Sequence, residues 1–173
     1  MHINILKSQI YMHDLFFEVA LLYFQCNHVC NIYVPKGSFS TDAQGCGYTR
    51  DCKANEVVRG VCPKGWHLPS LEEFEALLKA VGGSSVAALK LKATHGWTEN
   101  GNGADAFGFA AMPAGFRDAN GHFGFQDSCA YFWSTTEVYF ANSYFMDMYF
   151  RNNSADIPGD NKDIAFSVRC VKN

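Results

Sequence analysis

The stretch Cys62-Pro-Lys-Gly-Trp-His-Leu-Pro-Ser70 decides how the rest of the chain is interpreted. It ends on a serine, a residue type that commonly begins helices. Ser70 and Glu73 have the spacing of a capping box, in which the serine oxygen accepts from the Glu73 amide and the glutamate reaches back to the serine amide. A helix over 70–81 is therefore predicted, and Gly82-Gly83 is expected to end it. Its apolar face consists of Phe74, Leu77, Leu78 and Val81.

The chain after this helix is predicted to form one more short helix and then mainly strands. The second helix spans 85–92 and is expected to turn Val86, Leu89 and Leu91 inward. Period-two alternation and turn residues such as Asn-Gly mark the remainder. Strands are expected at 107–113, 121–125, 130–134, 143–150 and 165–171, with a turn at 118–121.

Length and composition bound the class of protein. The 173 residues suit one domain with room for a short extra segment. Aromatic residues make up 15% of the chain, which favours a sheet-rich core. The net charge of −3 argues against a sequence-independent nucleic-acid binder, because that class needs a basic surface.

The cysteines indicate disulfide chemistry. The chain has seven of them without any repeated CxxC metal spacing, so an oxidising compartment with one or two disulfides is favoured over a reduced cytosol. Cys46 and Cys52 enclose a short loop that a local disulfide can close, and two free thiols are the alternative. Cys26 and Cys30 have no second ligand pair nearby, so zinc is not expected.

Residues 1–40 carry the weakest pattern. The apolar run from Leu15 to Phe24 is interrupted by Glu18 and is followed at once by polar residues. It falls well short of the roughly 20 residues of a spanning helix, and no Ala-x-Ala cleavage site follows it. A packed helix or strand is the favoured interpretation. A degenerate targeting segment and a membrane span are the alternatives, in that order.

No pattern of a catalytic or cofactor site is found in the sequence. There is no Gly-x-Ser-x-Gly elbow, P-loop or dinucleotide motif, and no cysteine stands in a recognisable nucleophile context. His67 is expected to be a structural, hydrogen-bonded histidine. Asp118-Ala-Asn-Gly121 resembles part of a calcium loop without the later ligands. Asp156, Asp160 and Asp163 are interpreted as solvated loop acids, with calcium ligation as the alternative.

The candidate site is a surface near the C-terminus. Alternation in 143–150 places Met146 and Met148 on one side, which suits a core. Phe145 and Tyr149 lie on the other side, which we interpret as exposed; a sheet face packed on a neighbouring loop is the alternative. Aromatic side chains beside arginine and asparagine are typical of binding surfaces. The predicted ligand-binding residues are Val138, Tyr139, Phe140, Phe145, Asp147, Tyr149, Phe150, Arg151, Asn152 and Asn153, and, in the loop that follows, Asp163.

Several pieces of sequence share their order and spacing with a known family. They are Gly45-Cys-Gly-Tyr48, Val58-Arg-Gly-Val-Cys-Pro-Lys-Gly-Trp-His-Leu-Pro-Ser70, Ala104-Asp-Ala-Phe-Gly-Phe109, Pro113-Ala-Gly-Phe-Arg117, Tyr131-Phe-Trp-Ser-Thr135 and Phe166-Ser-Val-Arg-Cys-Val-Lys172. On these pieces, residues 43–173 closely resemble the Fibrobacter succinogenes major paralogous domain family.

The resemblance implies a C-type-lectin-like α+β fold, with two helices packed on small twisted antiparallel sheets and with long loops. It also implies a disulfide between Cys62 and Cys170, since a cysteine ahead of the first helix of this fold pairs with one on the last strand. Family members are typically exported or surface-attached bacterial proteins, which implies an extracellular or cell-surface location. Their variable positions correspond to 137–164, the region of the candidate site.

The chain also departs from the family and from its structural relatives. Residues 1–42 lack the family's tryptophan-containing strands and are expected to be an atypical N-terminal segment, truncated or foreign to the family. The calcium triplets of lectins are missing, and so is the cysteine pair of formylglycine-generating enzymes. We expect a non-catalytic domain that binds an extracellular protein or glycan, without cofactor, nucleic-acid partner or membrane span. A formylglycine-generating-enzyme-like oxidoreductase and a purely structural envelope protein are the alternatives.

Overall fold

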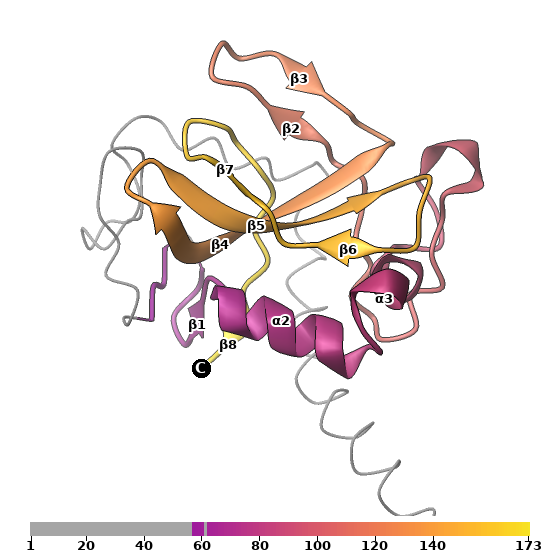
Figure 1. The fold of residues 1–173 in the computed structure, drawn as a ribbon, viewed down its shortest axis with the longest axis horizontal. Coiled ribbons are helices and arrows are strands. Elements are labelled where there is room, and N and C mark those ends of the chain that lie inside the picture. Colours follow the sequence, from indigo (N-terminus) through magenta and orange to yellow (C-terminus); the bar gives the residue numbers. More distant parts are fainter. Residues whose placement is uncertain (1–56, 61) are drawn as a thin grey trace, which may run out of the picture.

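The computed structural model describes residues 57–60 and 62–173. They form an α+β domain in which two helices lie beneath a small antiparallel sheet and a separate hairpin stands above it (Figure 1). The helices are α2 (Leu71–Ala80), α3 (Ser84–Leu91) and a short 3-10 helix, η2 (Thr98–Asn100). The strands are β1 (Trp66–His67), β2 (Phe116–Arg117), β3 (Phe123–Gly124), β4 (Cys129–Tyr139), β5 (Asn142–Tyr149), β6 (Ala155–Asp156), β7 (Gly159–Asn161) and β8 (Val171–Lys172).

Helix α2 forms as the sequence predicts. The Ser70 hydroxyl accepts from the Glu73 amide at 3.3 Å, and the Glu73 carboxylate accepts from the Ser70 amide at 2.8 Å, so the capping box is confirmed. Gly82 and Gly83 follow the helix with φ angles of 107° and 98°, which side chains other than glycine adopt only with strain. Along the predicted apolar face, Phe74, Leu78 and Val81 are buried and Leu77 is half-buried.

Helix α3 is confirmed in position, and Leu91 is completely buried as predicted, but the other two residues expected to turn inward are not. Leu89 is 41% exposed and Val86 is half-buried, whereas Ala87 and Ala88 are completely buried. The amides of Ala88 and Leu89 donate to the Asn153 carbonyl at 2.9 and 3.3 Å. A small alanine side chain lets the helix backbone come this close, so packing overrides the preference of the larger residues for burial.

The central sheet is built around the β4–β5 hairpin, and β5 also pairs with β6 and β7; all pairings are antiparallel. On the face toward the helices, Phe132, Met146 and Met148 belong to the main core. On the opposite face, Phe145 and Phe166 belong to a second buried cluster. The middle of the hairpin is therefore covered on both faces.

Two predicted strands are not formed as expected. Residues 107–113 are a loop with positive φ angles at Gly108 and Ala110, and their only ladder contact is a bridge between Lys92 and Ala111. The apolar alternation there comes from a loop that inserts Phe109 into the core. In the other predicted strand, 165–171, Ala165 and Ser167 make only isolated bridges, to Arg117 and Phe132, and Val171 alone joins a ladder, as part of β8.

A disulfide joins Cys62 to Cys170, with the two Cα atoms 5.8 Å apart, as the resemblance implied. It connects the approach to α2 with the approach to β8. Both cysteines pack with Val58 and Leu68 in a small apolar cluster. The predicted Cys46–Cys52 pair lies outside the described residues, as do Cys26 and Cys30.

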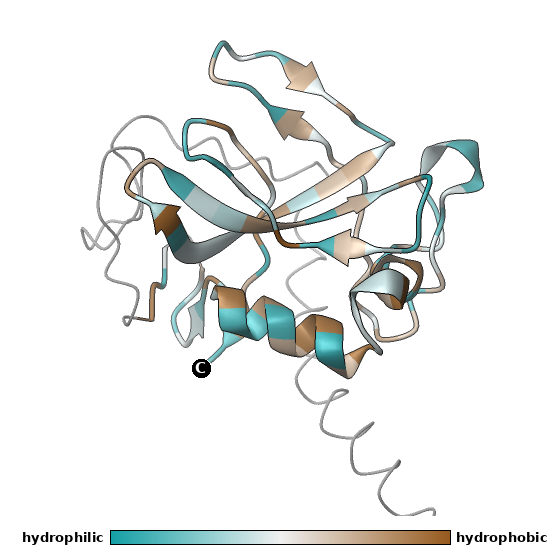
Figure 2. Cartoon of the chain, in the orientation of Figure 1, coloured by the Kyte–Doolittle hydropathy of each residue, from teal (hydrophilic) through white to brown (hydrophobic). Residues whose placement is uncertain are grey.

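Hydrophilic and hydrophobic residues alternate around α2, as expected for a helix with one buried side (Figure 2). Within the described part of the chain, no helix combines the length and the apolar character needed to cross a bilayer.

Candidate ligand-binding surface

The predicted binding residues lie at two separate ends of the β4–β5 hairpin. Tyr139 pairs with Asn142 beside the turn, whereas Tyr149 pairs with Cys129 at the opposite end. At the usual rise of a strand, the distance along β5 is about 23 Å. Asp163 lies at the turn end, where the adjacent Lys162 amide donates to Ala141 at 3.0 Å. One continuous binding face is therefore not formed.

The exposure expected of Phe145 and Asp147 is wrong: their exposed fractions are only 6% and 5%. The chain after β7 returns over this face, and the Phe145 ring lies 4.7 Å from the Phe166 ring, between centroids. The Trp133 ring packs against the same Phe166 at 4.4 Å. The packed-loop alternative therefore describes the middle of the sheet.

At the turn end, three consecutive large side chains reach into solvent. Val138, Tyr139 and Phe140 are 41%, 60% and 55% exposed; we call these three residues the hairpin tip. Lys162 holds the hairpin tip in place, because its Nζ donates to the Glu137 carboxylate and, at 3.2 Å, to the Phe140 carbonyl. These side chains stay exposed although the turn is held in place. Packing within the described domain therefore does not explain why large apolar residues occur here.

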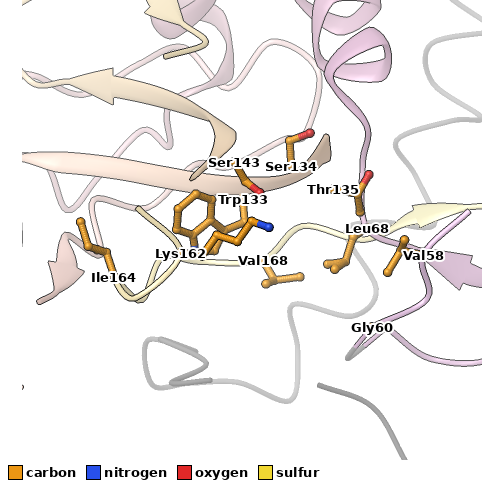
Figure 3. Close-up of a pocket in the computed structure, with 10 residues that line it drawn as sticks. All are labelled: Val58, Gly60, Leu68, Trp133, Ser134, Thr135, Ser143, Lys162, Ile164 and Val168. Atoms are coloured by element: carbon orange, nitrogen blue, oxygen red, sulfur yellow. The ribbon is translucent and has the colours of Figure 1, made fainter. Parts of the chain in front are cut away.

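A small pocket lies near the start of β5, and Lys162, which contacts the hairpin tip, forms part of its wall; we call it the tip pocket (Figure 3). Its cavity volume is about 40 Å³. The Lys162 side chain is only 4% exposed and forms part of the wall together with Ser143, whose exposed fraction is also 4%. Hydroxyl groups, one indole and aliphatic side chains line the pocket: Val58, Gly60, Leu68, Trp133, Ser134, Thr135, Ser143, Lys162, Ile164 and Val168.

The opposite end, which we call the far end, comprises Tyr149–Asn153. Its exposed polar residues include Arg151, which lies over the Phe150 ring at 4.7 Å and pairs with Glu99 at 3.5 Å. Phe150 itself is half-buried against the main core. The far end therefore presents a charged surface with little exposed aromatic area beyond Tyr149, which is 40% exposed.

A buried lysine holds the far end in place. Lys92 is 2% exposed, and its Nζ donates to the carbonyls of Tyr149 and Asn152, both at 3.0 Å. The same Nζ lies 4.8 Å from the centre of the Trp97 ring, a cation–π arrangement. Burial lowers the pKa of the Lys92 ammonium.

Titratable groups gather on the outer face of β4 and β5, beneath Tyr149. Burial is the main cause that raises the pKa of Asp147 to about 6, while the amide of Asp156 donates to its carboxylate at 3.3 Å and opposes that rise. Burial also raises the pKa of the Cys129 thiol. A thiol nucleophile needs a lowered pKa, so this environment does not activate Cys129.

Asp118 and the predicted structural histidine, His67, have hydrogen-bond partners within the domain. The Asp118 carboxylate accepts from the amides of Asn120 and His122 at 2.9 and 2.8 Å, as a turn-forming aspartate does. His67 is hydrogen-bonded at both ring nitrogens, to Glu73 at 2.9 Å and to Asn173 at 2.7 Å. Within residues 57–60 and 62–173, no group of three His, Cys, Asp or Glu side chains could hold a metal ion.

Sequence reasoning missed the residues that build the tip pocket. Trp133, Ser143 and Lys162 come from three segments, and their spacing follows no motif. The exposed aromatics Phe123 and Phe125 of the β2–β3 region, 57% and 59% exposed, were missed for a similar reason. Aromatic residues in a short strand ordinarily indicate burial, and only the three-dimensional arrangement shows otherwise.

Comparison with known proteins places the chain in a family. Neither the curated proteins nor the solved structures that were searched contain a match. A family model, the Fibrobacter succinogenes major domain, matches residues 22–172, a range that begins ahead of the first motif at residue 45. The chain therefore belongs to the Fibrobacter succinogenes major domain family.

Proposed function

We propose that this protein is a non-catalytic ligand-binding domain with a C-type-lectin-like fold, acting outside the cell or at its surface. Its ligand is an extracellular protein or glycan, engaged by the turn end of the β4–β5 hairpin and the loop to Asp163. The binding surface is therefore smaller than the one predicted from the sequence, and it consists of the hairpin tip and the tip pocket.

The observation that carries the proposal is the exposed hairpin tip. Val138, Tyr139 and Phe140 together keep large apolar area in water, which is unfavourable by about 25 cal/mol for each Å² that could be buried. The ion pair between Lys162 and Glu137 holds the turn in place. A surface ordered before binding loses less conformational entropy when a ligand arrives, which favours affinity.

The proposed fold and location have their own support. A disulfide that closes a long loop between the first helix and the last strand agrees with the fold that the resemblance implied. Disulfides persist mainly in oxidising environments, which is consistent with a protein outside the cytosol. The raised pKa of Cys129 is consistent with the absence of thiol-based catalysis.

The proposal can be tested by screening the purified protein on a glycan array and on an array of purified extracellular proteins. We expect at least one ligand that wild type binds and that the double variant Tyr139→Ala/Phe140→Ala binds at least tenfold more weakly. The matched control is Tyr149→Ala/Arg151→Ala, which removes an aromatic and a charge at the far end.

No ligand on either array would contradict the proposal and would favour the structural envelope protein. Equal loss in the two double variants would contradict the assignment of binding to the hairpin tip. Circular dichroism and thermal unfolding of both variants check that neither substitution unfolds the domain.

A further inference from the structure

We propose that the tip pocket receives an uncharged amide or hydroxyl side chain from a protein ligand, while the hairpin tip supplies apolar contact around it. This inference rests on the proposed function, and it assigns the class of ligand and the group that is recognised.

The first observation is a buried hydroxyl. Ser143 lies near the start of β5, is 4% exposed and lines the tip pocket. Its hydroxyl has no hydrogen-bond partner within residues 57–60 and 62–173. A buried polar group left without a partner is destabilising, because its desolvation is not offset by a hydrogen bond. A group entering the pocket can supply that partner, since a hydroxyl both donates and accepts.

The second observation is the charge around the pocket. The Lys162 ammonium, in the wall, is paired with Glu137. Two further carboxylates, Asp160 and Asp163, flank Lys162 in the sequence. Lys162 is the only charged residue in the described lining, and Glu137 already neutralises it, which disfavours a carboxylate or phosphate ligand. The Lys162–Glu137 pair also leaves no uncompensated negative charge inside the pocket to bind a cation, which indicates an uncharged group.

The third observation is size and shape. A cavity of about 40 Å³ accommodates only a few heavy atoms. Figure 3 shows the apolar side chains of Trp133, Ile164, Val168 and Leu68 gathered with Ser143 and Lys162 in the lining of the pocket. An Asn, Gln, Ser or Thr side chain meets these limits, because it places a small polar end on a short apolar stem.

A protein ligand is favoured over a glycan by the hairpin tip. Glycans present many hydroxyl groups, and each one buried needs a polar partner. Val138 and Phe140 offer no side-chain hydrogen bond, and Tyr139 offers a single hydroxyl. Aromatic side chains around one buried polar contact are instead typical of the centre of a protein–protein interface.

The chemistry can be tested with small probes on the isotope-labelled full chain. We expect acetamide to shift the Ser143 amide and Trp133 indole signals in a two-dimensional NMR spectrum, saturating with a Kd on the order of 1–100 mM for so small a ligand. Acetate, methylammonium and glucose, each at equal concentration, should shift these signals less than one-third as far. Ser143→Ala should remove the acetamide shifts while leaving the remaining spectrum unchanged.

Each outcome bears on the inference. Shifts from acetamide that Ser143→Ala abolishes would support it. Larger shifts from glucose would overturn the protein assignment but leave the proposed binding function intact. Shifts from acetate alone would overturn the uncharged-group assignment. No shift from any probe would mean that the pocket holds solvent only. In that case, a ligand from the array screen that wild type binds and the variant Tyr139→Ala/Phe140→Ala does not bind would still support the proposed function.

Discussion

Removing the Cys62–Cys170 disulfide is expected to destabilise the protein strongly. The two cysteines are separated by 108 positions, so the bond closes a loop that spans nearly all of the described domain. In the chain-entropy description, a cross-link over a loop of this length restricts the unfolded state by about 4.8 kcal/mol at 25 °C. A domain of ordinary stability has about 5–15 kcal/mol in total. The variant Cys62→Ala/Cys170→Ala should therefore lose a third or more of its stability.

Urea unfolding followed by tryptophan fluorescence measures this loss. With a slope of about 2 kcal/mol per molar urea, the midpoint should fall by about 2 M. The control is to add reductant to both proteins. Reduced wild type should unfold like the double variant, because both lack the same cross-link. A further fall in the reduced variant would report a second disulfide, such as the predicted Cys46–Cys52 pair.

A double variant within about 1 kcal/mol of oxidised wild type would refute this reasoning. It would mean either that the bond does not form in solution or that the unfolded chain stays compact without it. Mass-spectrometric mapping of non-reduced peptides distinguishes these two cases.

Three further predictions concern buried groups and close backbone contacts. The pKa of Asp147 is raised from 3.8 to about 6 in the folded protein, so between these pH values the folded protein retains a proton that the unfolded chain releases. The free energy of unfolding should therefore fall by on the order of 2 kcal/mol as pH rises from 4 to 6.5. Asp147→Asn should remove most of that fall. Lys92→Met keeps the apolar stem but loses two hydrogen bonds, so it should be destabilising by about 1–3 kcal/mol and speed hydrogen exchange at the far end. Gly115→Ala should be destabilising by about 3 kcal/mol, because the added methyl would meet the backbone at the C-terminal end of β3. Gly108 has a similar φ but open space around it, so Gly108→Ala should be destabilising by only about 1 kcal/mol.

Each of these predictions has an outcome that contradicts it. An unchanged pH slope in Asp147→Asn would assign the titration to another group. Uniformly faster exchange in Lys92→Met would mean that the lysine stabilises the whole domain and does not specifically position the far end. Equal losses at the two glycines would show that φ alone, and not the close approach, determines the requirement for glycine at position 115.

Helix α2 and its caps could be predicted because their determinants are local. Ser70 and Glu73 satisfy each other's amides within one turn, whatever the rest of the chain does. The Cys62–Cys170 pair could not be derived from spacing and came from the family resemblance. That resemblance rests on six pieces of sequence, three of which contain a cysteine.

The burial of Phe145 and Asp147 could not be predicted, for a physical reason. Alternation along a strand says which side chains share a face, but it does not say what covers that face. The cover over Phe145 is Phe166, in a segment that makes only isolated bridges to its neighbours, while Asp147 accepts a hydrogen bond from the amide of Asp156 in β6. The tip pocket was missed for the same reason, since it exists only where β4, β5, the chain after β7 and the segment 58–68 meet.

The most direct test of the account is the affinity of one purified ligand for three proteins, measured by titration calorimetry. They are wild type, Tyr139→Ala/Phe140→Ala and Tyr149→Ala/Arg151→Ala, all shown to be folded. We predict that Kd rises at least tenfold, about 1.4 kcal/mol, in the tip variant and less than twofold in the far-end variant. A tip variant that binds as wild type does, beside a far-end variant that loses binding, would contradict the assignment of function to the hairpin tip.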